Sequence, residues 1–489
     1  MSRLEDKQSA RADGVKTRHE VDLAVIGAGS AGLSAASGAA QLGRSVVMFE
    51  AHEMGGDCLN TGCVPSKAII RAGKAAQAFR EASKYGIENQ APEVNFAHVQ
   101  NHVRGVIAKI EPHDSQERFE GLGVTVIREA ARFAGKTTLE TDNHIVEARR
   151  IIVATGSRAA APPIPGLEDV PYLTNETIWD IEEQPSHLII IGAGPIGIEL
   201  GQTFKRLGTN VTVIDIADPL GQAEPEHAAT LVEALEREGV VFKAPAKTKR
   251  ISGKAGAIVV ELEDGSTVKG SHILVAAGRA PNVETLNLEA AGIDYDKRGI
   301  VTDANLRTSN PDVFAAGDVA KGGLTHEAGY HAGVIILGSY FLPPVINKLF
   351  AKADSVIPAA IYSEPELANI GMTEAEAKEK GVDYKVTTAG FDHIDRAITE
   401  RETVGGVKIV ATPRGKILGA SILGEHAGEL IQIIEVAMAN GVKLSKLAQH
   451  VAPYPTRGDA IRQAASNFYS DQVFSSKTRK LAGLLTKFH

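Results

Sequence analysis

The first informative pattern in the chain is a short apolar run followed by glycines and then by alanines. Residues 21–26 are mostly apolar, residues 27–32 contain three glycines, and residues 33–42 are rich in alanine. A short apolar run bounded by a glycine turn is typical of a buried strand, and the alanine-rich stretch favours a helix. A second apolar run over 45–49 ends in Glu50. The pattern predicts a strand, a tight turn, a helix and a second strand.

The same pattern occurs again in the middle of the chain, over 188–191, 192–197 and 210–214, and ends in Asp215. In both copies the acidic residue lies 23 positions after the first glycine (50 − 27 = 23 and 215 − 192 = 23). Glycines let the backbone approach a pyrophosphate at a helix N-terminus, and an acidic residue near this spacing binds a ribose. Glycine-rich turns without a ligand are the alternative, but this interpretation would have to explain why the acidic residue has the same spacing in both copies. Two dinucleotide sites are therefore expected, formed by Gly27, Gly29, Gly32 and Glu50 and by Gly192, Gly194, Gly197 and Asp215.

The two cysteines of the chain, Cys58 and Cys63, lie in the segment 55–67, directly after the first predicted nucleotide-binding unit. Two rare residues placed this close predict a redox-active disulfide, and the glycines around them supply the backbone freedom that a short bridged loop needs. Two buried, reduced thiols or half of a zinc site are the alternatives, although zinc needs about four ligands and the sequence holds no further cysteine. The position of the pair assigns FAD to the first nucleotide site and a nicotinamide to the second.

The residues around the second site favour NADH over NADPH. A 2′-phosphate would be repelled by the carboxylate of Asp215 and would need an arginine nearby, but residues 216–219 contain none. The expected cofactors are FAD and NAD(H), with NADP less favoured, and no metal site is expected.

The composition is that of an ordinary globular protein, 43% hydrophobic and 23% charged, and 489 residues suggest about three domains. A net charge of −8 gives no signature of nucleic-acid binding. The apolar stretch over 334–346 contains glycine, serine and two prolines and is shorter than the ~20 residues of a spanning helix. Residues 1–19 are polar and predict a disordered leader without an export signal, which indicates a cytoplasmic protein. The basic tail over 471–489 has apolar residues at helical spacing and is expected to pack on its own protein, with membrane binding not favoured.

Further motifs make the chain resemble the class I pyridine nucleotide-disulfide oxidoreductases, the family of dihydrolipoamide dehydrogenase and mercuric reductase. The motifs span residues 55–67, 154–157, 192–201, 276–282 and 315–318. The resemblance implies an α/β fold with two Rossmann-type dinucleotide-binding domains, for FAD and NAD, and a C-terminal α+β dimerisation domain that forms a homodimer. The implied domains are a leader at 1–19, a discontinuous FAD domain at 20–160 and 283–350, an NAD(H) domain at 161–282, an interface domain at 351–470 and the tail at 471–489.

The resemblance also implies roles for individual residues. Cys58 is expected to be the interchange thiol that meets the substrate, and Cys63 the thiol nearer the flavin. Lys67 is expected to lie near the flavin ring with Glu199 as its ion-pair partner, which holds a cation where negative charge develops on reduction. Asp318 is expected to bind the ribityl or phosphate region of FAD. The other cofactor-binding residues implied are Gly56, Thr155 and Gly156 for FAD and Gly278 for NAD.

The chain departs from the family near its C-terminus. Disulfide reductases of the family carry a His-Pro-Thr segment, in which the histidine is the acid and base, followed three residues after the threonine by a glutamate. Here Tyr454 and Asp459 occupy those two positions. A phenol with an unperturbed pKa near 10 is a poor base at neutral pH. We therefore expect an altered proton role for Tyr454 and Asp459, with His450 as the alternative acid and base.

Three functions are compatible with the sequence. The first is an NADH-dependent oxidoreductase of a lipoamide-like or other small dithiol or disulfide, similar to dihydrolipoamide dehydrogenase. The second is a mercuric reductase-like reductase of metal ions or quinones, which needs no imidazole, although the second cysteine pair that mercuric reductase uses is not found in this sequence. The third is a redox sensor. The expected partners are a small-molecule acceptor and a second copy of the chain.

Overall fold

The computed structural model describes residues 16–486 except 321, 342–345 and 347–350. The chain divides into two compact units, each built from three separate stretches of sequence. Unit 1 comprises residues 1–60, 108–158 and 279–353, and unit 2 comprises residues 61–107, 159–278 and 354–489.

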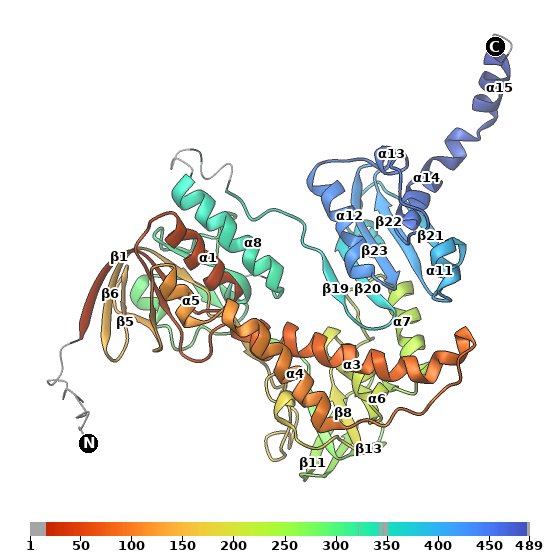
Figure 1. Cartoon of the computed structure of the whole chain (residues 1–489). Helices are drawn as coiled ribbons and strands as arrows, with labels where there is room; N and C mark the ends of the chain where they lie inside the picture. Colours follow the sequence, from red (N-terminus) through yellow and green to blue (C-terminus); the bar gives the residue numbers. More distant parts are fainter. Residues whose placement is uncertain (1–15, 321, 342–345, 347–350, 487–489) are drawn as a thin grey trace, which may run out of the picture. The chain divides into compact units, whose positions relative to one another are not determined.

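A largely parallel sheet forms the centre of unit 1 (Figure 1). Its strands follow the order β3-β2-β1-β6-β5-β4, and β18 also pairs with β6. All pairs are parallel except β6-β5 and β5-β4, which form an antiparallel edge. Residues 23–26 are buried without a polar interruption, as expected for a strand that is covered on both faces. The strands are β1 (Thr17–Ile26), β2 (Val46–Phe49), β3 (Val124–Ile127), β4 (Arg132–Phe133), β5 (Thr138–Glu140), β6 (His144–Val153) and β18 (Val313–Ala315).

Two helices of unit 1 lie side by side, α1 (Ser30–Gln41) and α8 (Thr325–Ile336) (Figure 1). Alanines at 35, 36 and 39 are fully buried on α1, and small side chains let the helix approach its neighbours closely. They share a hydrophobic core with the apolar residues of β1 and β2. The sheet and these helices hold the turn between β1 and α1 in a fixed position.

The middle of unit 2 contains a second parallel sheet in the order β10-β9-β8-β14. Its strands are β8 (His187–Ile191), β9 (Asn210–Ile214), β10 (Val241–Lys243) and β14 (His272–Val275). Helix α6 (Pro195–Arg206) follows β8, and α7 (Pro225–Arg237) follows β9. An antiparallel sheet of β11 (Thr248–Lys254), β12 (Ala257–Leu262) and β13 (Thr267–Gly270) completes this part of the unit.

The C-terminal part of unit 2 is a five-stranded antiparallel sheet in the order β19-β20-β23-β22-β21. Its strands are β19 (Ala359–Ile361), β20 (Glu366–Gly371), β21 (Lys385–Gly390), β22 (Gly406–Ala411) and β23 (Ile417–Gly424). Helix α12 (Ala427–Ala439) contacts β20 and β23, and α14 (Asp459–Val473) contacts β21 and β22. Apolar residues from both helices and the sheet form one hydrophobic core.

The structure groups residues 61–107 with unit 2, whereas the sequence prediction gave them to the first nucleotide-binding domain. Helix α3 (Cys63–Glu81) contacts α6, and Trp179 donates a hydrogen bond of 2.9 Å to the carbonyl of Thr61. The predicted junctions near 160 and 282 lie close to the unit boundaries at 158/159 and 278/279. At the N-terminus, β1 begins at Thr17, so residues 17–19 of the predicted leader belong to a strand, while residues 1–15 lie outside the described residues.

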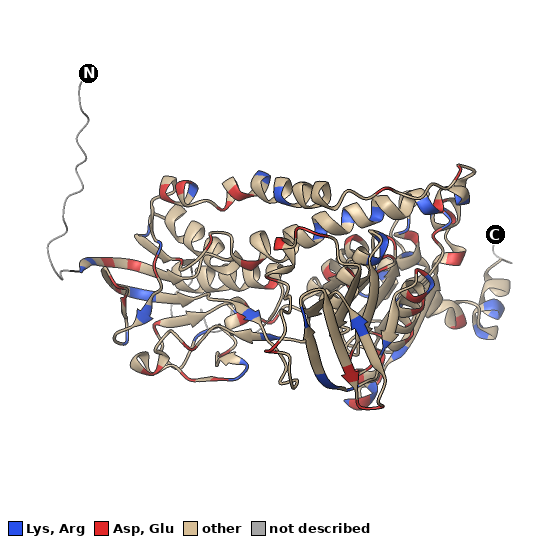
Figure 2. Ribbon diagram, turned by 90° about the horizontal axis from the view of Figure 1, so that it is seen from below, with Lys and Arg blue, Asp and Glu red and all other residues tan. Residues whose placement is uncertain are grey.

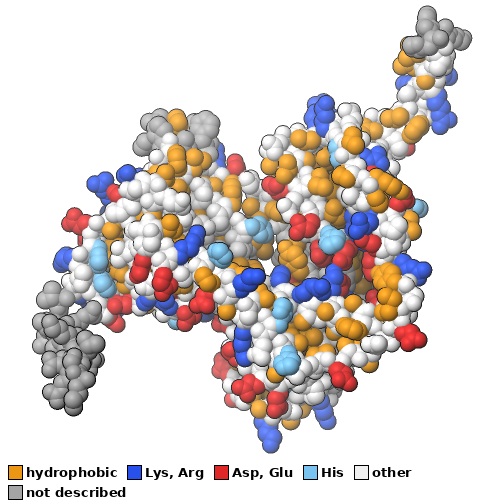
Figure 3. Space-filling model, in the orientation of Figure 1, with side chains coloured by type: hydrophobic (Ala, Val, Ile, Leu, Met, Phe, Trp, Pro, Cys, Tyr) orange, Lys and Arg blue, Asp and Glu red, His pale blue; other side chains and the backbone are white. Residues whose placement is uncertain are grey.

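The positions of Lys and Arg and those of Asp and Glu are interspersed along the described helices and strands (Figure 2). Among the described residues, no helix combines the length and hydropathy needed to cross a membrane. The predicted tail forms the end of α14 and a further helix, α15 (Ser476–Leu485). None of the residues of α15 is buried, so the expectation that the tail packs on its own protein is wrong for this helix. Hydrophobic side chains and Lys or Arg side chains lie together on α15 (Figure 3), and residues 487–489 are outside the described part.

Candidate functional site: two glycine loops and a cysteine segment

The turn between β1 and α1 can only be formed by glycine at two of its positions. Gly27 has a φ of +103°, and a Cβ atom there would overlap the carbonyl oxygen of Ala154. A Cβ at Gly32 would overlap the carbonyl oxygen of Gly27. Gly29 precedes α1, and no side chain caps the helix. The turn therefore presents bare backbone and the N–H groups of a helix N-terminus, which together favour a phosphate group.

Glu50, at the end of β2, is tied to this turn. Its carboxylate accepts hydrogen bonds from the backbone N–H of Ala28 at 2.7 Å and of His52 at 2.8 Å. These bonds hold the carboxylate beside the first glycine, where a ribose hydroxyl next to a bound pyrophosphate would meet it.

The turn between β8 and α6 repeats this construction. Gly192 has a φ of +113°, and a Cβ there would overlap the carbonyl oxygen of Ala276, while a Cβ at Gly197 would overlap that of Gly192. Asp215 accepts the backbone N–H of Ala193 at 2.6 Å. Gly194 precedes α6, again without a side-chain cap.

Two further contacts complete the second loop. Asp215 also accepts the backbone N–H of Ala217 at 2.9 Å. Gly278, predicted to bind NAD, has a φ of +155°, and its carbonyl accepts the N–H of Ala160 at 3.1 Å. Both glycine loops therefore fit the pyrophosphate and ribose of a dinucleotide.

The segment that ends in Cys58 lies directly on the first glycine loop. Gly56 has a φ of +59°, and a Cβ there would lie 2.7 Å from the Cα of Gly29. The N–H of Gly55 donates to the carbonyl of Ala28 at 3.0 Å. Cys58 is half-buried in the short helix α2 (Gly56–Asn60). The first loop therefore fixes the backbone that carries this thiol.

Cys63 is the first residue of α3, in the other unit. Its side chain is exposed. Gly62 precedes α3, and no side chain caps this helix. A thiolate at such a helix N-terminus is favoured by the helix dipole.

Arg279 joins three predicted site segments within unit 1. Its guanidinium donates to Asp57 at 2.7 Å and to the hydroxyl of Ser157 at 2.8 Å. Ser157 in turn donates to Asp318 at 2.6 Å. Asp318 is thereby placed as part of a polar group beside α2. Arg279 and Ser157 belong to motifs that the sequence contains, but nothing local in the sequence indicates that they share a partner.

Thr155 and Gly156 form hydrogen bonds with Asn282, a residue of the same unit. The hydroxyl of Thr155 donates to the carbonyl of Asn282 at 2.8 Å, and the N–H of Asn282 donates to the carbonyl of Gly156 at 3.0 Å. Gly156 has a φ of +66°, a conformation that favours glycine.

Lys67 and Glu199 meet as the sequence predicted. The Nζ of Lys67 lies 3.0 Å from Oε2 of Glu199, whose side chain is only 7% exposed. The second oxygen of Glu199 accepts the backbone N–H of Tyr362 at 2.9 Å. The ring of Tyr362 lies 4.6 Å from the Nζ of Lys67. Tyr362 is a member of this group that the sequence did not indicate, because it follows Lys67 by almost 300 positions.

Tyr454 and Asp459 form hydrogen bonds with different partners. The hydroxyl of Tyr454 is exposed and donates to Asp395 at 2.9 Å, and this bond raises the pKa of the phenol. Asp459 accepts hydrogen bonds from Arg462 at 2.6 Å and Gln463 at 2.9 Å on its own helix, and the bond from Arg462 lowers its pKa. The His450 ring nitrogen Nδ1 lies 2.7 Å from the carbonyl of Leu447. Within unit 2, Tyr454 pairs with Asp395 and Asp459 with its own helix.

Among the described residues, no group of three or more His, Cys, Asp or Glu side chains has a geometry that could hold a metal ion.

Comparison with known proteins identifies relatives over most of the chain. The profile of the pyridine nucleotide-disulphide oxidoreductase family matches residues 21–332, and the profile of its dimerisation domain matches residues 357–465. A mercuric reductase of Lysinibacillus sphaericus is 34% identical over 458 residues, which cover 92% of this chain and 83% of the relative. A dihydrolipoyl dehydrogenase of Thermus scotoductus is also 34% identical, over 467 residues that cover 92% of this chain and 98% of the relative.

Solved structures agree with these matches. The HOCl-induced flavoprotein disulfide reductase RclA of Escherichia coli, in its Cu(II) complex, has a TM-score of 0.79 at 26% identity and covers 91% of this chain and 99% of its own. The predicted fold class is confirmed, as are FAD and a nicotinamide dinucleotide as cofactors. The dimerisation-domain match supports the expected homodimer.

Proposed function

The chain belongs to the pyridine nucleotide-disulphide oxidoreductase family, and we propose that it is an NADH-dependent, FAD-containing oxidoreductase with Cys58 and Cys63 as its redox-active pair. The observation that carries this proposal is the close approach of Gly56 to Gly29, where an added Cβ would lie 2.7 Å from the backbone. This approach fastens the segment of Cys58 to the loop that fits the FAD pyrophosphate.

The two thiols have unequal roles in the proposed reaction. FAD held by the first glycine loop would supply the two-electron chemistry that links NADH to the sulfur atoms. The net step at the protein is the reduction of the Cys58–Cys63 disulfide, in which NADH and one proton yield NAD⁺ and two thiols. Cys63 would be the thiol nearer the flavin, and Cys58 would exchange with the substrate, whose disulfide it would open through a mixed disulfide.

Lys67 and Glu199 serve the same step. An ammonium near the flavin stabilises the negative charge that develops on reduction. Glu199 is buried and paired, so it holds Lys67 in place without a second cation. Asp215 selects NADH, because its carboxylate already accepts two backbone N–H groups and would repel a 2′-phosphate.

The substrate is proposed to be a small molecule of the lipoamide type, which accepts electrons as the disulfide and donates them as the dithiol. Dihydrolipoyl dehydrogenases among the relatives support this class of acceptor. Oxidation of such a dithiol by NAD⁺ gives the cyclic disulfide, NADH and one proton. Tyr454 is not the base for this step, because its hydrogen bond to Asp395 raises the pKa of a group that is already protonated at neutral pH.

A metal ion is the second candidate acceptor, because its reduction needs no histidine at the position of Tyr454. Reduction of Hg²⁺ by NADH gives Hg⁰, NAD⁺ and one proton, and reduction of two Cu²⁺ gives two Cu⁺ with the same products. Neither reaction takes a proton from the protein at the acceptor. Several relatives are named mercuric reductase, and the RclA structure is a Cu(II) complex.

An anaerobic titration with NADH tests the proposed electron path. The wild-type protein with FAD is expected to take up two equivalents, with a long-wavelength band from a Cys63 thiolate beside the flavin after the first. Cys58→Ser is expected to show this band before any NADH is added, since Cys63 is then a lone thiol, and Cys63→Ser is expected never to show it. Uptake of one equivalent by the wild type, without the band, would exclude the disulfide from the path.

A second experiment separates the acceptors. NADH formation is followed with NAD⁺ and dihydrolipoamide, and NADH loss is followed with Hg²⁺ or Cu²⁺ in the presence of excess thiol. Tyr454→His is expected to raise dihydrolipoamide turnover about tenfold, part of the 10²- to 10⁴-fold that a positioned base contributes. Tyr454→Phe is the control and is expected to leave turnover unchanged. No dihydrolipoamide turnover in either the wild type or Tyr454→His, together with rapid metal-ion reduction, would replace the first acceptor by the second.

A further inference from the structure

Lys67 has three described partners in unit 2, of which one is a carboxylate, one is an aromatic ring and one is the hydroxyl of Ser66, to which its Nζ donates at 3.3 Å. Its Nζ lies 3.0 Å from Glu199 and 4.6 Å from the centre of the Tyr362 ring. A cation over an aromatic face within about 6 Å is attracted by the ring quadrupole. The ammonium of Lys67 is therefore held by an anion, a neighbouring hydroxyl and an aromatic face, and the aromatic face is the only one of the three that offers no hydrogen bond.

The backbone of Tyr362 is fixed by the carboxylate that binds Lys67. Oε1 of Glu199 accepts the N–H of Tyr362 at 2.9 Å, and Oε2 lies 3.0 Å from Nζ of Lys67. One buried side chain thus aligns the ring and the ammonium at the same time. Any rotation of Glu199 that released the ammonium would also release the N–H of Tyr362.

The next residues of the chain are held by the same face of α6. Gln202 accepts the N–H of Glu364 at 2.8 Å and donates to its carbonyl at 2.7 Å. Arg206 forms an ion pair with the Glu364 carboxylate, and it binds Glu238 through two further nitrogen–oxygen contacts of 2.7 Å. Glu199, Gln202 and Arg206 are three and four positions apart, so they follow one side of the helix. Side chains of α6 therefore hold the segment 362–364 at Tyr362 and at Glu364.

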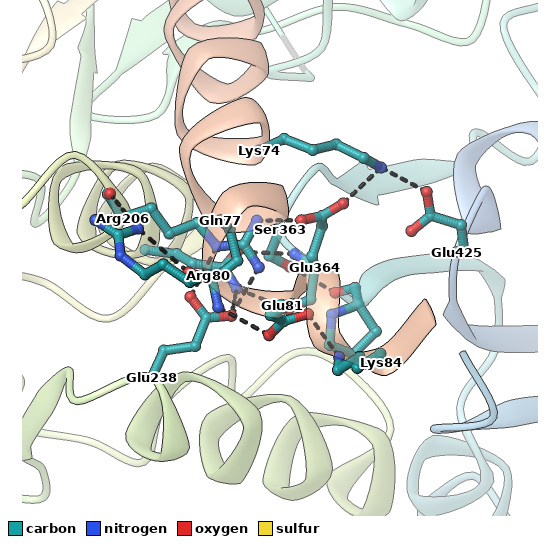
Figure 4. Close-up of polar contacts among 12 residues, drawn as sticks. Lys74, Gln77, Arg80, Glu81, Lys84, Arg206, Glu238, Ser363, Glu364 and Glu425 are labelled. Atoms are coloured by element: carbon teal, nitrogen blue, oxygen red, sulfur yellow. Dashed lines mark hydrogen bonds and ion pairs between the residues drawn. The ribbon is translucent and has the colours of Figure 1, made fainter. Parts of the chain in front are cut away.

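Helix α3 also helps to hold Glu364, through Lys74. Figure 4 shows Glu364 between Lys74 and Arg206, and Lys74 reaches both Glu364 and Glu425 at 2.5 Å. Burial alone would raise the pKa of Glu364, but the charges of Arg206 and Lys74 outweigh it and hold the pKa below its usual range. Glu364 is therefore a carboxylate at neutral pH. Lys67 and Lys74 lie on the same helix, so the anchor at Lys74 also limits how far Lys67 can move relative to Tyr362.

We propose that Tyr362 is a positioning residue for the ammonium of Lys67, which it holds with its ring face in the direction that serves the flavin. The proposal rests on the proposed function, in which Lys67 stabilises the reduced flavin. The ring and not the hydroxyl does the positioning, because the described contacts of Tyr362 are made by its ring and its backbone N–H. Burial raises the pKa of the phenol above its usual value, so the ring is neutral at physiological pH and its face stays attractive to a cation.

The expected effect follows from the exposure of the ring. Tyr362 is 39% exposed, which places the contact near the weaker end of cation–π interactions. Tyr362→Leu is expected to slow flavin reduction by NADH about two- to fivefold and to make the flavin harder to reduce at equilibrium. Tyr362→Phe keeps the ring and is expected to behave as the wild type.

The experiment combines two readouts on the FAD-loaded protein. The first is the flavin reduction potential, measured by equilibration with a dye of known potential. The second is the proton resonance of Lys67 after reductive ¹³C-methylation, which keeps the charge, with the resonance assigned by its loss in Lys67→Arg. A methyl group over an aromatic ring is shifted upfield, so the wild type and Tyr362→Phe are expected to share an upfield resonance that Tyr362→Leu lacks.

Tyr295→Leu is the matched control, because Tyr295 is 42% exposed and makes its hydrogen bond to Glu289 in unit 1. It is expected to change neither readout. Flavin content and thermal midpoint are compared in all variants. If Tyr362→Leu keeps the wild-type potential and the upfield resonance, the positioning role is wrong. A wild-type protein that binds no FAD, or that NADH does not reduce, would overturn the proposed function instead, and the resonance would still test the contact of ring and ammonium.

Discussion

The two glycine loops are built alike and covered differently. In both, the first glycine has a φ above +100° and lies against a carbonyl of a neighbouring strand end, and the third lies against the carbonyl of the first. In both, an acidic residue at the end of the next strand accepts the N–H that follows the first glycine. The loops differ at their middle glycine. A Cβ at Gly29 would contact Gly56, whereas a Cβ at Gly194 would have no atom within 4 Å.

This difference agrees with the two kinds of ligand that are proposed for the loops. A loop with a second segment of backbone lying on it suits a dinucleotide that stays bound. A loop whose middle glycine has open space suits a dinucleotide that must enter and leave in each turnover. The proposed assignment of FAD to the first loop and NADH to the second therefore gains a physical reason beyond the position of the cysteines.

The largest effect is expected from the third glycine of either loop. Gly32→Ala and Gly197→Ala each place a Cβ on the carbonyl of the first glycine, and overpacking of this kind costs roughly 1–3 kcal/mol. Gly32→Ala is expected to weaken FAD binding up to about a hundredfold, and Gly197→Ala to weaken NADH binding by a similar factor with the flavin retained. Flavin content after gel filtration and NADH titration measure the two losses. Loss of flavin in Gly197→Ala at an unchanged thermal midpoint would contradict the assignment of the sites.

A smaller effect is expected from the residue that covers the first loop. Gly56→Ala places its Cβ 2.7 Å from the Cα of Gly29 and requires a left-handed backbone, so FAD affinity is expected to fall about tenfold. The control is Gly194→Ala, where a Cβ meets no neighbour and φ is −80°. It is expected to leave flavin content unchanged. Equal flavin loss in both variants would show that the cover over the first loop has no role in retaining FAD.

The smallest effect concerns the carboxylates. Asp215→Asn removes the charge that favours ribose hydroxyls over a 2′-phosphate, while its amide oxygen can still accept one backbone N–H. The dissociation constant of NADH is expected to rise about fivefold, and that of NADPH is expected to change little. Hydrogen bonds to charged groups contribute ~1.5–3 kcal/mol, and the substitution removes only part of this contribution. Stopped-flow reduction with each coenzyme gives both constants. Glu50→Gln, the equivalent change in the first loop, should leave the ratio of the two constants as it is in the wild type.

The glycine loops could be predicted from the sequence because each lies within about 30 residues and obeys a local backbone rule. Glu50 and Asp215 are fixed by the same local geometry. The pairing of Lys67 with Glu199 needed the family resemblance, since no local pattern joins residues 132 positions apart. Tyr362 could not be predicted by either route, because its position depends on the packing of the C-terminal part of unit 2 on α6. The bond between Tyr454 and Asp395 is likewise a product of tertiary packing, and the family motif pointed instead to Asp459.

The row of Glu199, Gln202 and Arg206 on α6 has a consequence for exchanging parts between relatives. Helix α6, which begins at the second glycine loop, also forms hydrogen bonds with the backbone of residues 362–364, near the start of the C-terminal sheet. A chimaera that takes its C-terminal part from another member of the family must therefore bring α6 with it, or match these three side chains. Helix α6 and residues 362–364 therefore form one structural unit that has to be exchanged together.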